Sequence, residues 1–172
     1  MPTQLVSGCR NHYAVLGREC LQRASAWEDD GATHFRRGVL VPYQFDFDHT
    51  NQIARGRFEG RITDEDLRKY YSDAEKYVAL TKPRGGLLDF SAASSFEVTP
   101  ATIQHLATLT PVLANPSLPR VLLAPEPSIF GMLRMFEMLG DRTRPSLHVV
   151  MTEQEAWAIL GVWEPQFGPY RE

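Results

Sequence analysis

The chain has 172 residues, of which 43% are hydrophobic and 23% charged, and its formal net charge at pH 7 is −3. This composition is that of a globular domain with enough apolar residues for a substantial core. The slightly acidic balance argues against nucleic acid as a partner, because a nucleic-acid binder carries a basic patch or stripe. No apolar run approaches the ~20 residues that cross a bilayer, and no secretory signal precedes the domain, so we expect a cytoplasmic protein.

Residues 1–38 lack the regular patterning of the rest and are predicted to be a poorly ordered N-terminal extension of a domain at residues 39–172. A weak helical pattern around Trp27 leaves a docked helix as the alternative, and the frequent arginines leave an organelle transit peptide as a third. Cys9 and Cys20 are too few for a disulfide framework or a zinc site. We therefore predict free thiols and expect no metal and no cofactor.

The regular part of the chain begins with a predicted β-hairpin. Apolar and polar residues alternate over residues 43–48 and again over residues 54–62, which is typical of strands with one apolar face. In an antiparallel pair, Asp46 and Asp48 of the first strand face the arginines of the second. We interpret this charged face as a solvated hairpin surface.

Helices and buried strands alternate after the hairpin. The predicted elements are a helix from Thr63 to Pro83, a strand around 87–89, a helix after Thr99-Pro100, a strand at 120–124, a helix at about 128–139, a strand at 147–151 and a helix opened by a capping box at Thr152 and Glu155. The order β-β-α-β-α-β-α-β-α predicts an α/β fold with a mixed sheet of about five strands and about four helices.

Three passages within residues 43–162 carry a resemblance to a known family. They are RFEGRI at 57–62 ahead of an acidic helix start, LDFS at 88–91, and FGMLRMF at 130–136. With the order of the elements, they resemble the STAS domain, the fold of the anti-sigma-factor antagonists, and in particular the poorly characterised STAS-like branch of bacterial proteins. The resemblance implies a regulatory module that binds a partner protein or a second copy of itself.

The antagonists that this chain resembles carry a loop after the third strand that ends in Asp-Ser, and a partner kinase phosphorylates that serine. Laid on this pattern, Glu97 occupies the acidic position and Val98 the position of the serine. Valine cannot accept phosphate, and the hydroxyl of Thr99 is predicted to cap the next helix. The usual phosphoserine switch is therefore expected to be missing unless Thr99, Ser94 or Ser95 has replaced that serine.

Asp89 lies at the carboxyl end of a predicted parallel strand, where α/β sheets usually place ligands. It is either a site carboxylate or, as we favour, an acceptor for the backbone N–H groups of the following small-residue loop, residues 91–99. Ser91, Ser94 and Ser95 of that loop fit an anion site at the next helix N-terminus, but small turn formers are the favoured interpretation.

The helix at about 128–139 is predicted to have more apolar surface than one core face uses. Its core stripe comprises Ile129, Met132, Leu133, Phe136 and Leu139. Phe130, Met135 and Met138 fall outside this stripe, and methionine suits irregular contact surfaces. These three side chains either pack beneath a neighbouring loop or form a homodimer face, a partner groove or the wall of an apolar pocket.

Three functions follow, in decreasing order of preference. The first is a non-catalytic module that binds a partner protein or itself through the helix at 128–139 and residues 91–99. The second is a carrier of an apolar small molecule or lipid, because the STAS-like fold is similar in outline to part of the CRAL-TRIO lipid-transfer fold. The third, a hydrolytic enzyme using Asp89 and a serine, lacks a base at a readable spacing, so we predict that the chain is not an enzyme.

Overall fold

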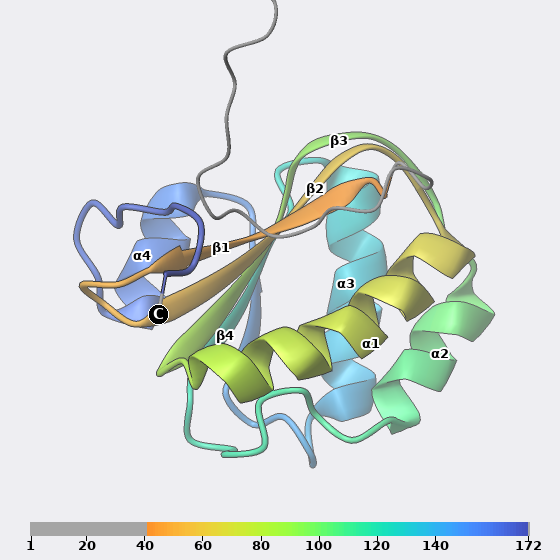
Figure 1. The fold of residues 1–172 in the computed structure, drawn as a ribbon. Coiled ribbons are helices and arrows are strands. Elements are labelled where there is room, and N and C mark those ends of the chain that lie inside the picture. The colour runs from red at the N-terminus through yellow and green to blue at the C-terminus, as the bar shows by residue number, and fades with distance from the viewer. Residues whose placement is uncertain (1–40, 172) are drawn as a thin grey trace, which may run out of the picture. The chain divides into compact units, whose positions relative to one another are not determined.

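The computed structural model describes residues 41–171, so the predicted extension at residues 1–38 lies outside the described residues. Five strands form one sheet in the order β1-β2-β3-β4-β5 (Figure 1). They are β1 (Tyr43–Asp48), β2 (Ile53–Thr63), β3 (Gly85–Glu97), β4 (Arg120–Leu123) and β5 (Leu147–Val150). Only the pair of β1 with β2 is antiparallel among these strands. The predicted α/β fold with a mixed five-stranded sheet is confirmed.

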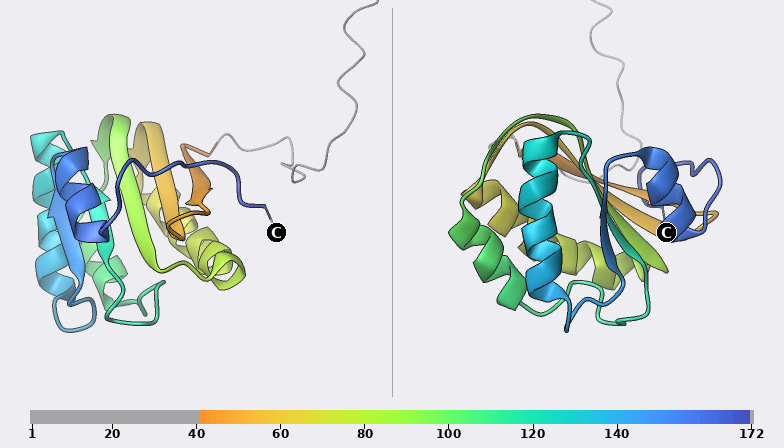
Figure 2. Two further views of the ribbon diagram at one scale, coloured as in Figure 1. Left: turned by 90° about the vertical axis from the view of Figure 1, so that its left-hand side faces the viewer. Right: turned by 180° about the vertical axis from the view of Figure 1, so that it is seen from behind.

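Four helices cover the two faces of this sheet. They are α1 (Asp64–Thr81), α2 (Pro100–Thr108), α3 (Pro127–Gly140) and α4 (Glu153–Leu160). The first three pack on one face, and α4 lies on the other, as the view from behind shows (Figure 2). Side chains alternate between the two faces along β4, where Leu122 joins the larger core and Val121 and Leu123 join the smaller one.

Side-chain caps begin α1, α2 and α4, as the sequence predicts. The Thr63 hydroxyl accepts from the backbone N–H of Asp66, and the Asp66 carboxylate accepts from that of Thr63. The same reciprocal arrangement joins Thr152 and Glu155 at α4. Each cap satisfies backbone donors that a helix leaves without an intrahelical partner.

The predicted pairing of acidic residues with arginines across the hairpin is confirmed for one of the two acidic residues and is wrong for the other. Asp46 lies opposite Arg55, and their side chains form an ion pair of 2.6 Å. Asp48, which was expected to face arginines, instead lies opposite Ile53. It is buried and accepts from the backbone N–H groups of Thr50 and Asn51 at 2.9 and 3.0 Å, so its carboxylate fixes the turn of the hairpin.

The third strand is longer than the sequence analysis predicts. The expected loop at residues 91–99 is strand as far as Glu97, because β2 continues alongside it to Thr63. The register shifts next to Gly60, whose φ of 73° falls in the left-handed region that glycine adopts readily. The two strands curve together at this end of the sheet, and β2 leads into α1 while β3 leads into α2 (Figure 1).

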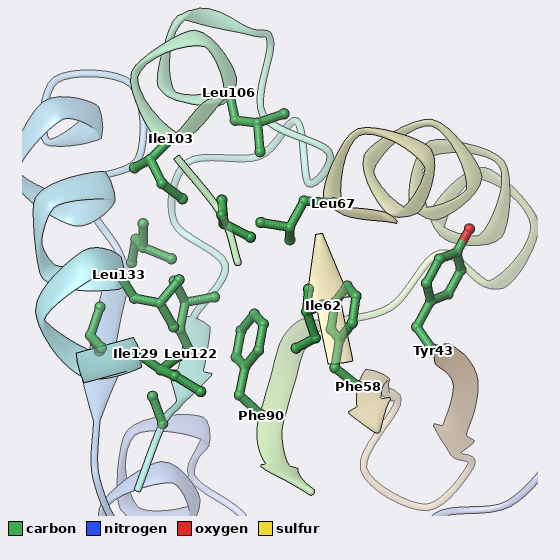
Figure 3. Close-up of a cluster of buried hydrophobic side chains, with 14 residues drawn as sticks. Tyr43, Phe58, Ile62, Leu67, Phe90, Ile103, Leu106, Leu122, Ile129 and Leu133 are labelled. Carbon is green, nitrogen blue, oxygen red and sulfur yellow. The ribbon is translucent and has the colours of Figure 1, made fainter. Parts of the chain in front are cut away.

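Aromatic packing joins the sheet to α1 in the larger core (Figure 3). Phe58 and Phe90, from adjacent strands, stack with ring centroids 5.1 Å apart. The ring of Tyr70 contacts Phe58 at 5.0 Å and lies over Gly56. A Cβ atom on Gly56 would stand 2.3 Å from the Tyr70 oxygen, so this close approach requires glycine.

The variant Gly56→Ala should destabilise the domain by about 1–3 kcal/mol, because its methyl group forces Tyr70 out of its position. Denaturant unfolding measures the change. Gly131→Ala in α3 is the matched control: no atom lies within 4 Å of its added Cβ, and it should stabilise the helix by about 0.5–1 kcal/mol. Equal effects of the two substitutions would contradict this account.

Candidate functional site

The residues expected at the carboxyl end of β3 are held in a regular strand. Asp89 is 5% exposed, and its Oδ1 accepts from the backbone N–H of Ser91 at 2.8 Å. Ser91 and Ser94 are exposed and Ser95 is half-buried. The Asp89 carboxylate thus satisfies a backbone donor at the point where β4 stops pairing with β3.

Thr99 caps α2, as predicted, and its hydroxyl both accepts and donates a hydrogen bond. It accepts from the backbone N–H of Thr102 at 3.3 Å and donates to Asp64 Oδ2 at 2.9 Å. The backbone N–H of Thr99 donates to Asp64 Oδ1 at 2.8 Å and is the main cause that lowers the pKa of this carboxyl. A carboxylate therefore faces the hydroxyl, and Val98 beside it is buried.

Helix α3 uses most of its apolar side chains in the core. Ile129 and Leu133 are buried. The half-buried side chains that pack against the same core are Phe130, Met132, Met135 and Phe136. Leu139, which was predicted to be core, is 52% exposed, and Met138 is 73% exposed. The free apolar surface of α3 is therefore its last turn, where the neighbouring elements no longer cover it.

A cavity of about 160 Å³ lies between the sheet and helices α1, α2 and α3, and the sequence analysis did not predict it. Ala54 and Gly56 of β2 and Gly86 of β3 line its sheet side. Arg120 and Leu147, the first residues of β4 and β5, also line the cavity. It is thus placed toward the amino ends of the parallel strands, away from the end where Asp89 and Thr99 lie.

Aromatic rings supply much of the cavity lining. The six that line it are Phe45, Tyr70, Tyr71, Tyr77, Phe90 and Phe136. Phe45 stacks on Tyr70 and on Tyr77 with centroids 5.2 and 4.7 Å apart, which ties β1 to α1. Burial raises the pKa of Tyr70 and raises that of Tyr77 to about 12, so both hydroxyls stay protonated at neutral pH. These six aromatic side chains are therefore uncharged at neutral pH, and Arg55 of β2 also belongs to the lining.

Two buried arginines line the opposite side of the cavity. Arg144 is 4% exposed, and its guanidinium donates to the carbonyls of Leu106, Ala107 and Leu109 at 3.3, 2.9 and 2.8 Å. It also donates to the hydroxyls of Tyr71 and Thr143. The Arg144 side chain thus caps the carboxyl end of α2, where helix carbonyls lack partners.

Arg120 is 8% exposed and holds the connection between α2 and β4. Its Nη1 donates to the carbonyls of Pro116 and Leu118 at 3.3 and 3.0 Å, and its Nη2 donates to those of Leu113 and Asn115. Its Nε is buried without a hydrogen-bond partner among residues 41–171. Burial, and then the like charge of Arg144, lower the pKa of Arg120.

Three polar side-chain atoms are enclosed by the protein without a hydrogen bond. Within the described residues they are Arg57 Nε, Tyr77 Oη and Arg120 Nε. The last two belong to residues that line the cavity. Because all three atoms are covered by protein atoms, they are not reached from the cavity in this conformation.

Across residues 41–171, no group of three or more histidine, cysteine, aspartate or glutamate side chains is arranged to hold a metal ion. Among the helices described here, none is both long and apolar enough to span a membrane. His148 on β5 is exposed.

Two solved structures align with the chain at low identity. No protein-family model and no curated protein matches the chain. The anti-sigma factor antagonist SpoIIAA in its unphosphorylated form aligns with 71% of this chain and 99% of its own, at 14% identity and a TM-score of 0.47. The Bacillus cell fate determinant SpoIIAA in the phosphorylated form aligns with 67% and 96%, at 18% identity and a TM-score of 0.45. The order of the elements, a mixed five-stranded sheet with four helices, is the STAS-like arrangement that the sequence predicts.

Thr99→Ala should lower the free energy of unfolding by about 1–2 kcal/mol, because it removes the cap of α2 and the hydroxyl that binds Asp64. Thr99→Ser keeps both hydrogen bonds and should restore most of this loss. Ser94→Ala on exposed β3 is the control and should stay within about 0.5 kcal/mol of the unchanged protein. Urea unfolding of the four proteins measures these differences, and a neutral Thr99→Ala would contradict the assigned role.

Proposed function

We propose that this domain is a non-catalytic binding module that takes up an apolar small molecule in the cavity beneath α1. The observation that carries the proposal is the aromatic-lined cavity of about 160 Å³ between the sheet and three helices. Binding sites for small molecules are concave and mostly apolar, with a few polar groups that orient the ligand. The described cavity fits this pattern, since apolar and aromatic side chains make up most of its lining.

The volume of the cavity limits what it binds. An engineered protein cavity of about 150 Å³ lined by apolar side chains stays dry and binds benzene. The cavity described here, at about 160 Å³, therefore accommodates a single ring or a short branched chain. Of the two ligands that the carrier hypothesis allows, this volume favours an apolar small molecule over a lipid with a long acyl chain.

We further propose that the module works without the phosphoserine switch of the antagonists it resembles. Three features support this: Val98 is buried where the serine would align, Thr99 is committed as a cap, and the Asp64 carboxylate faces its hydroxyl at 2.9 Å. A phosphate on Thr99 would stand against that negative charge, which is unfavourable. Ser91 and Ser94 are exposed but lie within a paired strand.

Toluene is a suitable first probe for the cavity, since it is apolar and slightly larger than benzene. At ten times its Kd, a ligand that binds only the folded protein stabilises it by about 1.4 kcal/mol, which raises the Tm by a few degrees. Ala74→Leu adds methyl groups from α1 into the cavity and should abolish this rise. Ala79→Leu, exposed on the same helix, should leave the rise unchanged. Unfolding scans that show no rise for the unchanged protein would refute the proposal.

Self-association through the end of α3 is a second candidate, and one observation favours it. Met138 and Leu139 are adjacent, 73% and 52% exposed, and lie in the last turn of a helix whose other apolar side chains are already packed. Neighbouring exposed apolar side chains of this size are typical of contact surfaces. We propose that two copies meet here, in keeping with the interaction module expected from the sequence.

Met138→Glu should dissociate such a dimer, because the contact would bury an unpaired carboxylate. Sedimentation velocity over a range of concentrations measures the association. Gln154→Glu, exposed on α4 away from this surface, adds the same charge and should leave the dimer intact. A dimer that persists in Met138→Glu, or an unchanged protein that is monomeric at about 100 µM, would rule this contact out.

A further inference from the structure

We infer that the ligand of the cavity carries one neutral hydroxyl group on a single ring or short chain, and that this group forms a hydrogen bond with Tyr70 Oη. The inference rests on the proposed function of the cavity and specifies the chemical class of its ligand. It is carried by the Tyr70 hydroxyl, which belongs to the lining, has no partner in the described part of the chain and is not enclosed by it.

The tyrosine hydroxyls near the cavity do not all have partners in the protein. The Tyr43 hydroxyl donates to Asp73 Oδ2 at 2.8 Å, and the Tyr71 hydroxyl accepts from Arg144 Nη2 at 3.2 Å. Among residues 41–171, by contrast, nothing forms a hydrogen bond with the Tyr70 hydroxyl. Because a tyrosine hydroxyl removed from bulk solvent ordinarily has a partner, this one points to a partner that binds from outside the chain.

The Tyr70 hydroxyl is open to the cavity, unlike that of Tyr77. Tyr77 Oη is enclosed by protein atoms, whereas Tyr70 Oη also lacks a hydrogen bond but is not enclosed, so it keeps accessible surface. It lies against Gly56, where a Cβ atom would clash with it, and both residues line the cavity. Burial raises the pKa of Tyr70, as expected for a hydroxyl that faces an internal space rather than bulk solvent.

The ring of Tyr70 is held in place before a ligand arrives. It stacks on Phe45 with centroids 5.2 Å apart and contacts the rings of Phe58 and Tyr43 at 5.0 and 5.3 Å. Gly56, which lacks a side chain, leaves room for the hydroxyl beside β2. A group that is already fixed loses little conformational freedom when a ligand bonds to it, so its hydrogen bond contributes more to affinity.

The surroundings favour a neutral polar group on the ligand over a charged one. The charged residues of the lining are arginines whose guanidiniums already bind carboxylate or carbonyl oxygens, namely Arg55, Arg120 and Arg144. A single tyrosine hydroxyl does not compensate an ionised ligand group for the water that it loses. A ligand hydroxyl can both donate to Tyr70 Oη and accept from it. Phenol, with one ring and one hydroxyl, is therefore the simplest probe of the inferred class.

The deciding experiment compares phenol with toluene, which has nearly the same shape and carries a methyl group in place of the hydroxyl. Calorimetry on the unchanged protein measures the Kd of each. An apolar cavity without a partner for the hydroxyl favours toluene, because phenol gives up its hydrogen bonds to water on entering. With Tyr70 as the partner, we expect phenol to bind at least as tightly as toluene.

Two variants that each remove a single oxygen atom assign this preference to Tyr70. Tyr70→Phe keeps the ring, and the affinity for phenol relative to toluene should fall by about tenfold. Tyr77→Phe is the matched control, since it removes an enclosed hydroxyl from the same helix and the same lining, and it should leave the ratio of the two Kd values unchanged. If Tyr70→Phe does not fold, the comparison of phenol with toluene on the unchanged protein still decides the question.

The outcomes separate the inference from the proposed function. Weaker binding of phenol than of toluene by the unchanged protein overturns the inferred hydroxyl ligand, while the cavity remains a binding site. A ratio that Tyr70→Phe leaves unchanged, or that Tyr77→Phe lowers equally, places the ligand hydroxyl elsewhere and also overturns the inference. Binding of neither phenol nor toluene overturns the proposed function itself.

Discussion

Two buried guanidiniums hold together the side of the domain on which the cavity lies. Arg120 and Arg144 donate to the carbonyls at the end of α2 and along residues 109–118, a segment without regular hydrogen bonding of its own. Loop carbonyls that are removed from water must find donors, and a guanidinium supplies five N–H groups in one plane. Burying each positive charge costs several kcal/mol, so each guanidinium needs all of the hydrogen bonds that it makes to these carbonyls. Pro111 and Leu113 of the same segment line the cavity, which therefore depends on the two arginines for its shape.

The cavity lies at the opposite end of the sheet from the one that sequence reasoning favours. In open α/β sheets, ligands bind beyond the carboxyl ends of the strands, which here means Asp89 and Thr99. In this domain, β2 and β3 continue as a paired ribbon past the end of β4, and the Thr99–Asp64 contact closes the start of α2. The cavity instead lies beside Ala54 and Gly86, toward the amino ends of the same strands.

Local patterns predict the elements of this fold well, because each depends on residues close together in the chain. The alternation around Phe45 gives β1, and the caps at Thr63, Thr99 and Thr152 fix three helix starts. The small residues at 91–95 resemble a loop in isolation, and only pairing with β2 makes them strand. In the same way, an arginine at the start of an apolar strand suggests an exposed strand end when only the sequence is considered. Arg120 is instead buried by the segment before β4, whose carbonyls accept its hydrogen bonds. The sequence alone does not show that this segment folds back over the arginine.

The two proposed activities share one helix. Leu133 and Phe136 of α3 line the cavity, Met138 and Leu139 lie within the next turn, and Arg144 follows shortly after, with its guanidinium 5.1 Å from the Phe136 ring. A ligand changes an association equilibrium only by its difference in affinity between the two states, and the effect is reciprocal. A ligand that ordered α3 through Phe136 and Arg144 would therefore strengthen a dimer formed at Met138, and dimer formation would tighten ligand binding by the same factor. A ligand that left α3 unchanged would have no effect on association, however tightly it bound.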